Sequence, residues 1–247
     1  MQDKTPHEPL AGRRILITGG TTGIGRAVLV SLAAQRARVL TFGRDPTALR
    51  EALAAAELVE KFGLTADAGD PADIERVFAA VDERLGGIDV LVACAGLGAK
   101  PIHEMADEDW REVVETNLVG YMACARAALD RMLAQGSGHI VLVSSISPEI
   151  KAAGESVYAA TKGGIDAFAL TLRKEVADEG IRISVIQPGS VGSDMQPCDA
   201  EEQREAIARG EMLFAEEIAE AIAFVLTRSS RCDIPLLRIE PIRQKTG

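Results

Sequence analysis

Close to its N-terminus the chain reads Arg14-Ile15-Leu16-Ile17-Thr18-Gly19-Gly20-Thr21-Thr22-Gly23-Ile24-Gly25. The apolar run at the start is typical of a strand buried on both faces of a sheet, and a helical pattern begins at Ile24, directly after the glycines. We therefore predict a strand, a tight turn and a helix in immediate succession. This order is the context in which a glycine-rich turn holds a dinucleotide.

The glycines of this turn suit a close approach of backbone to phosphate. Gly19 allows the tight turn, while Gly23 and Gly25 let the backbone come near a pyrophosphate and let the helix pack on the sheet. The helix start adds unpaired N–H groups and partial positive charge. The spacing is G-x-x-x-G-x-G rather than G-x-G-x-x-G, and a purely structural turn stays open as the alternative. The candidate cofactor-binding residues in this stretch are Gly19, Thr21, Thr22, Gly23, Ile24 and Gly25.

Short apolar runs alternate with Ala-rich helical patterns along the whole chain. The predicted strands are Arg14–Thr18, Arg38–Phe42, Gly63–Ala66, Ile88–Ala93, His139–Ser144, Arg182–Gln187 and Ile234–Ile239. The predicted helices are Ile24–Gln35, Pro46–Glu60, Pro71–Leu85, Asp107–Gln135, Val157–Glu179 and Ala215–Thr227. Asp70 is predicted to be the N-cap of the helix that begins at Pro71. Most strand runs are continuously apolar, as in a parallel sheet. The fold class is therefore α/β, a doubly wound (Rossmann) parallel sheet of about seven strands flanked by helices on both faces.

A chain of 247 residues fits one large α/β domain. We expect that domain over residues 12–247, after a flexible N-terminal tail over residues 1–11 that is polar and holds two prolines. Between the sixth strand and the last helix, the polar segment Ser193–Gly210 is predicted to be irregular. A long insertion after a strand's carboxyl end is where a substrate lid belongs.

Composition excludes several classes of partner. The 27 Lys and Arg residues against 37 Asp and Glu give a net charge of −10, which argues against nucleic-acid binding but leaves room for one local cationic site. No apolar run approaches the ~20 residues of a membrane span, so no membrane partner is expected. The four cysteines form no C-x-x-C pair and the three histidines are scattered, which predicts a cytoplasmic protein without a metal site.

The end of the second strand bears on the choice between NAD and NADP. An acidic residue there hydrogen-bonds the ribose hydroxyl of NAD, but this strand ends in Gly43, followed by Arg44. A guanidinium binds a 2′-phosphate with two hydrogen bonds, and Thr21 and Thr22 add hydroxyl donors. We interpret Asp45 as the N-cap of the helix that begins at Pro46. NADP is therefore favoured over NAD, with a solvated Arg44 as the alternative.

A second constellation carries reactive groups. Tyr158 and Lys162 stand four residues apart and so share one helix face. A neighbouring ammonium supplies part of the pKa shift that a phenol, with a free pKa near 10, needs for proton transfer near neutral pH. Ser145 follows the fifth strand at the edge where such sheets bind ligands, and its hydroxyl suits a carbonyl oxygen. From composition alone, Ser144 and Ser147 are rivals.

Taken together, these motifs resemble the short-chain dehydrogenase/reductase family, in its single-domain type of about 250 residues. The resemblance covers roughly residues 12–240. It rests on the glycine-rich turn and on a series of motifs in the family's order: Asp67, Ala95-Gly96, Asn117, Ser145, Tyr158-x-x-x-Lys162 and Pro188-Gly189-x-Val191-x-Ser193.

The resemblance implies a role for each of these residues. Tyr158 acts as general acid in reduction and base in oxidation, Lys162 lowers its pKa and binds the nicotinamide ribose, and Ser145 holds the substrate oxygen. Asn117 binds a water linked to Lys162; the alternative is an ordinary polar residue on a wet helix face. The remaining implied cofactor contacts are Asp67 to adenine, Ala95 and Gly96 beside the adenosine ribose, and Pro188, Gly189, Val191 and Ser193 around the nicotinamide.

Two features depart from the family pattern. After the fourth strand the family usually has Asn-Asn-Ala-Gly, where this chain has Ala93-Cys94-Ala95-Gly96, and we interpret Cys94 as a buried thiol. The C-terminal sequence, Asp233 to Gln244, lacks the Gly-rich ending of many relatives. It is similar to a branch of the family that oxidises small 3-hydroxy acids, serine-like substrates and assorted alcohols.

Three hypotheses of function follow. The first is an NADP-dependent oxidoreductase that interconverts a small alcohol or hydroxy acid and its carbonyl form. The second is a 3-oxoacyl-thioester reductase of the acyl-carrier-protein type, and the third is a catalytically silent NADP-sensing regulatory protein. The resemblance also implies a homodimer or homotetramer. A helix stripe of Ile165, Phe168, Ala169, Leu172 and Val176 faces either the chain's own core or a second subunit.

Overall fold

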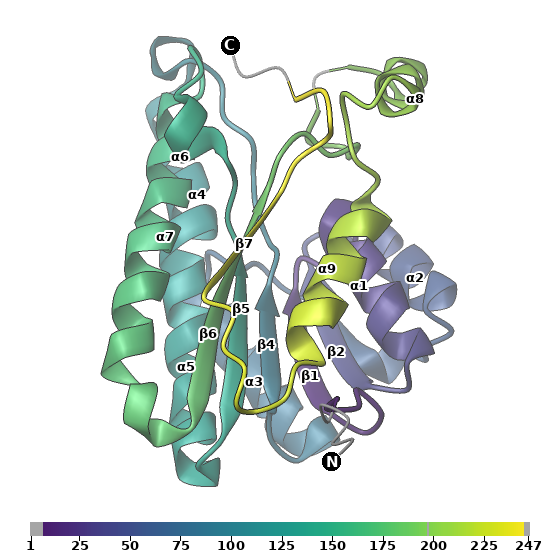
Figure 1. Ribbon diagram of the computed structural model, residues 1–247, viewed down its shortest axis with the longest axis vertical. Coiled ribbons are helices and arrows are strands. Elements are labelled where there is room, and N and C mark those ends of the chain that lie inside the picture. Colours follow the sequence, from purple (N-terminus) through teal and green to yellow (C-terminus); the bar gives the residue numbers. More distant parts are fainter. Residues whose placement is uncertain (1–6, 197, 245–247) are drawn as a thin grey trace, which may run out of the picture.

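The computed structural model describes residues 7–196 and 198–244. Its centre is one parallel sheet of seven strands in the order β3-β2-β1-β4-β5-β6-β7 (Figure 1). From β1 the chain builds the sheet outward to β3, and then returns to place β4 on the other side of β1. The strands are β1 Arg14–Thr18, β2 Arg38–Gly43, β3 Gly63–Thr65, β4 Val90–Ala93, β5 Gly138–Val143, β6 Ile181–Pro188 and β7 Leu236–Ile239. The predicted doubly wound α/β fold is confirmed.

Helices cover both faces of this sheet (Figure 1). One face carries α1 Gly23–Ala34, α2 Pro46–Ala55 and α9 Ala215–Leu226; the other carries α3 Pro71–Leu85, α5 Gly120–Gln135 and α7 Ser156–Glu175. The shorter helical elements are η1 Glu60–Phe62, η2 Ile102–Glu104, α4 Asp107–Val114, η3 Glu115–Val119, α6 Ser147–Ile150, η4 Ala177–Glu179 and α8 Ala200–Ala208. Among the residues described, no helix combines the length and the apolar character needed to cross a membrane.

Two helices start where the sequence predicts, and for the predicted reason. Asp45 accepts hydrogen bonds from the Thr47 and Ala48 N–H groups (2.7 and 3.2 Å), with Pro46 at the first helical position of α2. Asp70 caps α3 in the same way, through the Ala72 N–H at 2.8 Å. A side-chain cap of this kind contributes about 1 kcal/mol to stability. Asp45 is therefore engaged in fixing the helix that follows the candidate phosphate-binding residue Arg44.

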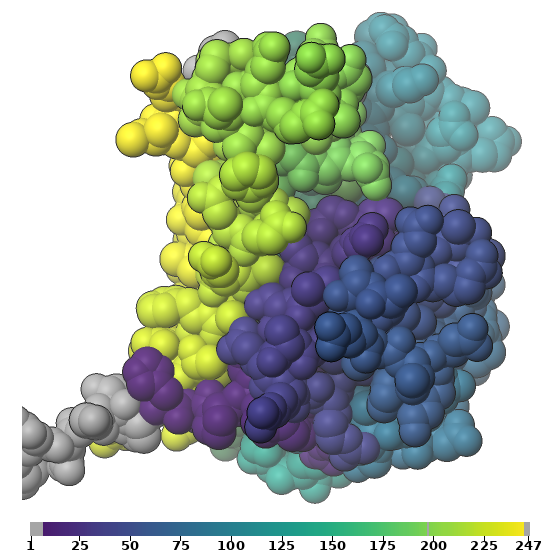
Figure 2. Space-filling model, turned by 90° about the vertical axis from the view of Figure 1, so that its right-hand side faces the viewer, coloured from purple at the N-terminus to yellow at the C-terminus, as the bar shows by residue number. Residues whose placement is uncertain are grey.

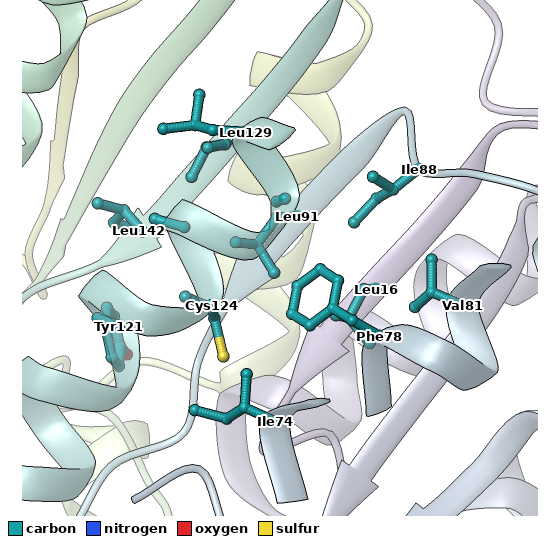
Figure 3. Close-up of a cluster of buried hydrophobic side chains, with 14 of the residues drawn as sticks. Leu16, Ile74, Phe78, Val81, Ile88, Leu91, Tyr121, Cys124, Leu129 and Leu142 are labelled. Atoms are coloured by element: carbon teal, nitrogen blue, oxygen red, sulfur yellow. The ribbon is translucent and has the colours of Figure 1, made fainter. Parts of the chain in front are cut away.

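A cluster of buried apolar side chains fills the space between the sheet and the face formed by α3, α5 and α7 (Figure 3). Phe78 from α3 and Cys124 from α5 lie in it against Leu91 of β4. The predicted α7 stripe belongs to this core: its buried members are Ile165, Ala169, Leu172 and Val176, with Phe168 packed against the cluster. The stripe thus faces the chain's own interior.

The single helix predicted over Asp107–Gln135 is interrupted. α4 ends at Val114, five residues form the π-helical segment η3, and α5 begins at Gly120. The backbone packs tightly at this junction, since a Cβ on Gly120 would lie 2.3 Å from the Ala68 carbonyl oxygen. Single π turns inside α-helices frequently mark functional sites, and this one contains Asn117.

The prediction of an irregular segment over Ser193–Gly210 is wrong in its second half, which holds α8. The Asp199 carboxylate accepts from the Glu201 and Glu202 N–H groups, and the Glu202 side chain accepts from the Asp199 N–H. This reciprocal capping box satisfies the N–H groups that open a helix. In Figure 2, α8 (green) stands above the purple and blue N-terminal half of the molecule.

The structure differs from the predicted loose tail at residues 8–10. Leu10 is buried in the core on the α1 and α9 face. The Glu8 carboxylate forms ion pairs with Arg13 and with Arg182 (3.2 Å). The backbone N–H of Glu8 donates to the Thr227 carbonyl at 3.1 Å. Residues 1–6 of the predicted tail lie outside the described residues.

Candidate active site

A cleft of about 500 Å³ opens at the carboxyl edge of the sheet, where the loops after β1 and β4 lead away in opposite directions. This is the position at which doubly wound sheets bind ligands. Every predicted cofactor residue lines it: Gly19, Thr21, Thr22, Gly23, Ile24, Gly25, Arg44, Asp67, Ala95, Gly96, Pro188, Gly189, Val191 and Ser193, with Tyr158 and Lys162. Ser145 lines the same cleft, whereas Asn117 does not.

The glycine-rich turn leaves no room for side chains. Gly19 has a left-handed backbone (φ +67°), and a Cβ there would lie 2.5 Å from the Ala95 Cα. A Cβ on Gly25 would lie 2.1 Å from the Gly19 carbonyl oxygen. The buried Thr18 hydroxyl fastens the neighbouring loop by accepting from the Cys94 and Ala95 N–H groups (3.1 and 3.0 Å). The ends of β1 and β4 are thus held as one rigid cradle, and sequence reasoning missed the part played by Thr18.

The residues around this cradle fit a nicotinamide dinucleotide. The first turn of α1 follows the cradle directly, and its N–H groups suit a pyrophosphate. The Thr116 hydroxyl oxygen is buried without a hydrogen-bond partner among the described residues, although Thr116 lines the cleft. Buried polar atoms are ordinarily paired, so this hydroxyl is available to a polar ligand. Thr116 belongs to none of the sequence motifs, so the sequence did not indicate this residue.

The end of β2 has the features predicted for a phosphate-bearing ribose. Gly43 packs under Thr21, and a Cβ there would lie 2.6 Å from the Thr21 Cγ2. The half-exposed Arg44 guanidinium forms an ion pair with Glu112 of α4 and lies 3.9 Å from the Asp67 carboxylate. A 2′-phosphate bound by Arg44 therefore competes with these two carboxylates for the guanidinium.

The three candidate serines have different surroundings. The buried Ser144 hydroxyl donates to the backbone carbonyl of Lys162 at 3.2 Å. The Ser145 hydroxyl donates to the Ser147 hydroxyl at 3.0 Å and accepts from the Ser147 N–H at 3.1 Å. Ser147 is buried and outside the cleft, while Ser145 is partly exposed and lines it beside Tyr158. Of the three, Ser145 has the hydroxyl best placed for a ligand.

Tyr158 and Lys162 come from the first half of α7, which brings both into the cleft. Burial raises the pKa of the Tyr158 phenol to about 12, opposed by a hydrogen bond with Ser145. Burial lowers the pKa of the Lys162 ammonium to about 8, and its Nζ donates to the Val143 carbonyl at 2.9 Å. The phenol is therefore protonated at neutral pH. The resemblance implies that Lys162 lowers the pKa of Tyr158, but Lys162 is not among the groups that set this pKa, and desolvation dominates it.

Asn117 is fully buried, which differs from an ordinary polar residue on a wet helix face. Its side chain accepts from the Leu97 N–H (2.7 Å) and donates to the Leu97 carbonyl (2.8 Å), and its amide lies 3.5 Å from the Thr161 hydroxyl. The amide therefore locks the loop after β4 to the π turn and to α7. The water-binding role implied for Asn117 remains a prediction.

Cys94 lines the cleft close to Lys162. Burial raises the pKa of its thiol to about 12, with a smaller opposing effect from the Lys162 charge. A neutral thiol of this kind is a weak nucleophile. The residue is only partly buried, which differs from the prediction of a buried thiol. All four cysteines are free thiols.

The loop after β6 is braced by the C-terminal segment. The Gly189 N–H donates to the Ile239 carbonyl at 2.8 Å, and the Ser190 N–H donates to the Gln244 Oε1 at 2.9 Å. A Cβ on Gly189 would lie 2.5 Å from that same Oε1. Beyond Gly189, Met195 and Gly98 both line the cleft, and a Cβ added to Gly98 would lie 3.4 Å from the Met195 Cγ. Neither Gln244 nor Met195 was singled out in the sequence, because their partners are remote along the chain.

Comparisons with known proteins agree with this geometry. A family model described as short chain dehydrogenase matches residues 13–204. The 3-oxoacyl-[acyl-carrier-protein] reductase FabG of Escherichia coli is 33% identical over 222 residues, which cover 87% of this chain and 89% of that protein. Glycine betaine reductase ATRR of Emericella nidulans is 32% identical over 246 residues, which cover 96% of this chain and 19% of that protein.

Solved structures with the same fold contain nicotinamide cofactors. An actinorhodin polyketide ketoreductase variant with NADPH has a TM-score of 0.82 and 29% identity, covering 93% of this chain and 96% of that chain. A short chain dehydrogenase from Burkholderia cenocepacia in complex with NADP has a TM-score of 0.83 and 27% identity, covering 95% and 98%. With the cradle, the cleft and these likenesses together, the chain belongs to the short-chain dehydrogenase/reductase family and is an NAD(P)-dependent oxidoreductase.

Proposed function

We propose that this protein is an NADP-dependent oxidoreductase that interconverts a small alcohol or hydroxy acid and its carbonyl form. One observation carries the proposal: Ser145, Tyr158 and Lys162 line the same cleft as the glycine cradle. A substrate oxygen between Ser145 and Tyr158 would therefore lie beside a bound nicotinamide. The cofactor supplies the hydride in reduction and accepts it in oxidation.

In this proposal the chain's own residues orient the substrate and move one proton. The Ser145 hydroxyl donates a hydrogen bond to the carbonyl oxygen. Tyr158, whose pKa is raised by burial, holds a proton at neutral pH and delivers it to that oxygen as the alcohol forms. The Lys162 ammonium stabilises the phenolate that is left behind. At neutral pH Tyr158 holds its proton, which favours reduction; at alkaline pH a larger fraction is phenolate, which favours oxidation.

The preference for NADP rests on the end of β2. Gly43 offers no acid for the ribose hydroxyls, and Thr21 covers it. Arg44 supplies a cation beside the cleft, and Thr22 lines the same wall. Two of the structural neighbours were solved with NADPH or NADP, which supports the same choice.

For the substrate, a small molecule is our first choice and a 3-oxoacyl thioester the second. The first is supported by the short lid and by the C-terminal sequence, and the second by the likeness to 3-oxoacyl-[acyl-carrier-protein] reductases. The presence of Ser145, Tyr158, Lys162 and Asn117 argues against a silent NADP-sensing regulator.

The proposal includes an assembly of two or four copies in the cytoplasm. Four large apolar side chains on η3, α5 and α7 are exposed despite the well-filled core: Val119 (43% exposed), Met122 (36%), Leu133 (44%) and Leu170 (41%). Apolar surface of this kind suits contact with a second copy. Sedimentation of the purified protein measures the number of copies directly.

The test is a turnover screen with NADPH and NADH on small ketones, hydroxy acids, alcohols and a 3-oxoacyl thioester. We expect NADPH-linked turnover of a small substrate, and a loss of about 10²- to 10⁴-fold in Tyr158→Phe with NADPH binding retained. Selective turnover of the thioester would support the second candidate. Turnover unchanged in Tyr158→Phe contradicts the assigned chemistry, and NADPH binding without any turnover supports the regulator.

A further inference from the structure

The ammonium group of Lys162 lies between two aromatic rings. Its Nζ is 5.6 Å from the ring centroid of Tyr158 and 5.2 Å from that of Tyr121, a residue of α5. Both distances are within the range in which a cation is attracted to the face of an aromatic ring. Tyr158 is the proposed proton donor, but Tyr121 lies outside the cleft lining and has no role so far.

Tyr121 and Lys162 also share one hydrogen-bond acceptor. The Tyr121 hydroxyl donates to the Val143 carbonyl at 3.1 Å, and the Lys162 Nζ donates to the same oxygen at 2.9 Å. Val143 is the last residue of β5 and lines the cleft. At the end of the neighbouring strand β4, the chain is tied to the sheet in a different way, because the Ala95 N–H donates to the Thr18 hydroxyl. The Val143 carbonyl is thus a junction at which α5 and α7 meet the sheet.

Burial makes these contacts important for the charge of Lys162. The side chain is only 4% exposed, and within the described part of the chain Lys162 forms no salt bridge. The titratable groups that face it are Cys94 after β4, Tyr158 and Asp166 on α7, and Tyr121 on α5. Asp166 accepts from Gln187 of β6 and also senses Glu149 of α6.

We propose that Tyr121 is a positioning residue, which fixes the Lys162 ammonium at the Val143 carbonyl and stabilises its charge through the ring face. This proposal rests on the proposed function, because it assigns a reason for Lys162 to stay charged beside Tyr158. Tyr121 acts through Lys162 and touches neither substrate nor the cleft.

Figure 3 shows why Tyr121 can hold this position. Its ring lies at one end of the buried apolar cluster, near Leu142 of β5, and is 2% exposed. Burial raises the pKa of its hydroxyl well above the ordinary value, so the group remains a neutral donor. One side of the Tyr121 ring therefore packs against apolar side chains. On the other side the ring face meets the Lys162 ammonium, and the hydroxyl donates to the Val143 carbonyl.

The experiment compares Tyr121→Leu and Tyr121→Phe with a control, Phe78→Leu, which removes a fully buried aromatic ring of the same core from α3. The first readout is the titration of the Lys162 amine by NMR on ¹⁵N-lysine-labelled protein, with Lys162→Arg to assign the signal. The second is the pH profile of NADPH-dependent reduction, and the third is thermal unfolding.

We expect Tyr121→Leu to lower the pH at which Lys162 titrates by about one unit, and to move the alkaline limb of the reduction profile with it. Tyr121→Phe keeps the ring and so keeps the titration within a few tenths of a unit. Phe78→Leu lowers the unfolding temperature without moving either titration. If Tyr121→Leu does not fold, Tyr121→Met, whose longer and more flexible side chain adapts better to the vacated space, is measured in its place.

A folded Leu or Met variant whose Lys162 titrates as in the parent protein overturns the proposal. A shift of equal size in Phe78→Leu overturns it too, since the effect would then reflect loosened packing. The NMR titration needs no substrate or cofactor, so it distinguishes this proposal from the proposed function. If the parent protein lacks turnover, only the latter fails.

Discussion

The β1–α1 turn and the segment that follows β6 form two walls of one cleft, and they hold their shapes by different means. The turn is made of glycines packed backbone to backbone, with the Gly19 and Ala95 main chains in close contact. The segment after β6 is held by hydrogen bonds to parts of the chain that are remote in sequence: the Gly189 N–H donates to the Ile239 carbonyl, and the Ser190 N–H to the Gln244 side chain. At Gly19 and Gly25 the first wall admits no side chain without displacement of the main chain, whereas the second wall tolerates change at a cost in precision.

The strongest challenge to the first wall is Gly25→Val. Its Cβ would lie 2.1 Å from the Gly19 carbonyl oxygen, so the turn must open before α1 can form. We expect NADPH binding to weaken by more than about 100-fold, because the backbone N–H groups that face the phosphates are displaced. Fluorescence titration with NADPH measures this. The control is Gly86→Ala, at a left-handed position with open space around it, where we expect lower stability and unchanged binding. Intact NADPH binding in a folded Gly25→Val protein would show that this wall is softer than described.

Arg44→Ala tests the cation that the end of β2 places beside the backbone donors of the first wall. Loss of a charge-assisted contact predicts about 10- to 100-fold weaker NADPH binding and a much smaller change for NADH. The dissociation constants for the two cofactors, measured side by side, give the answer. Equal losses for both cofactors contradict a contact with the 2′-phosphate.

The pH dependence probes the proton groups between the two walls. Burial depresses the pKa of Lys162 to about 8, so its charge is fully present below that pH and is lost above it. Burial raises the pKa of Tyr158 to about 12, so the phenolate that oxidation needs increases throughout the accessible alkaline range. We expect reduction to be level near neutral pH and then to fall by up to about tenfold per unit above pH 8, while oxidation rises. Initial rates in both directions from pH 6 to pH 10 test this, and parallel profiles in the two directions would contradict it.

Gln244→Ala tests the second wall and should have the smallest effect. The Ser190 N–H loses its acceptor, which costs about 1 kcal/mol and loosens the loop beside the nicotinamide position. We expect kcat/KM to fall about fivefold, with NADPH binding changed less. Ile242→Ala, which alters a side chain that is 93% exposed in the same segment, is the matched control. The same loss in both variants would mean that the segment acts through its bulk, without a specific contact of Gln244.

The two walls also differ in how far they could be predicted from the sequence. The turn, the caps at Asp45 and Asp70 and the alternation of strands and helices follow from neighbours along the chain, and they match the prediction closely. Gln244, Tyr121 and Thr18 act through contacts that are remote in sequence, so no local pattern indicates them.

Two differences inside the site have physical reasons. The π turn at Asn117 arises where Gly120 packs on the Ala68 carbonyl, which a helical periodicity does not reveal. The pKa of Tyr158 is raised, where the resemblance implies a lowering by Lys162, because a separation of four residues says nothing about desolvation, and desolvation dominates both pKa values. By contrast, a local signal for α8 was present, since Asp199 and Glu202 have the spacing of a capping box.

The length of α8 has a consequence for how substrate reaches the cleft. At nine residues it is shorter than the ~12–15 that an isolated helix needs to persist in water. Gln203 ties it to the segment that precedes it, because its side chain donates to the Ser193 and Cys198 carbonyls, and Ala206 is buried. If α8 leaves these contacts it loses its helix as well, so an opening of the predicted lid would be a loss of order rather than the swing of a rigid hinge. Amide hydrogen exchange in α8 would measure how often that order is lost.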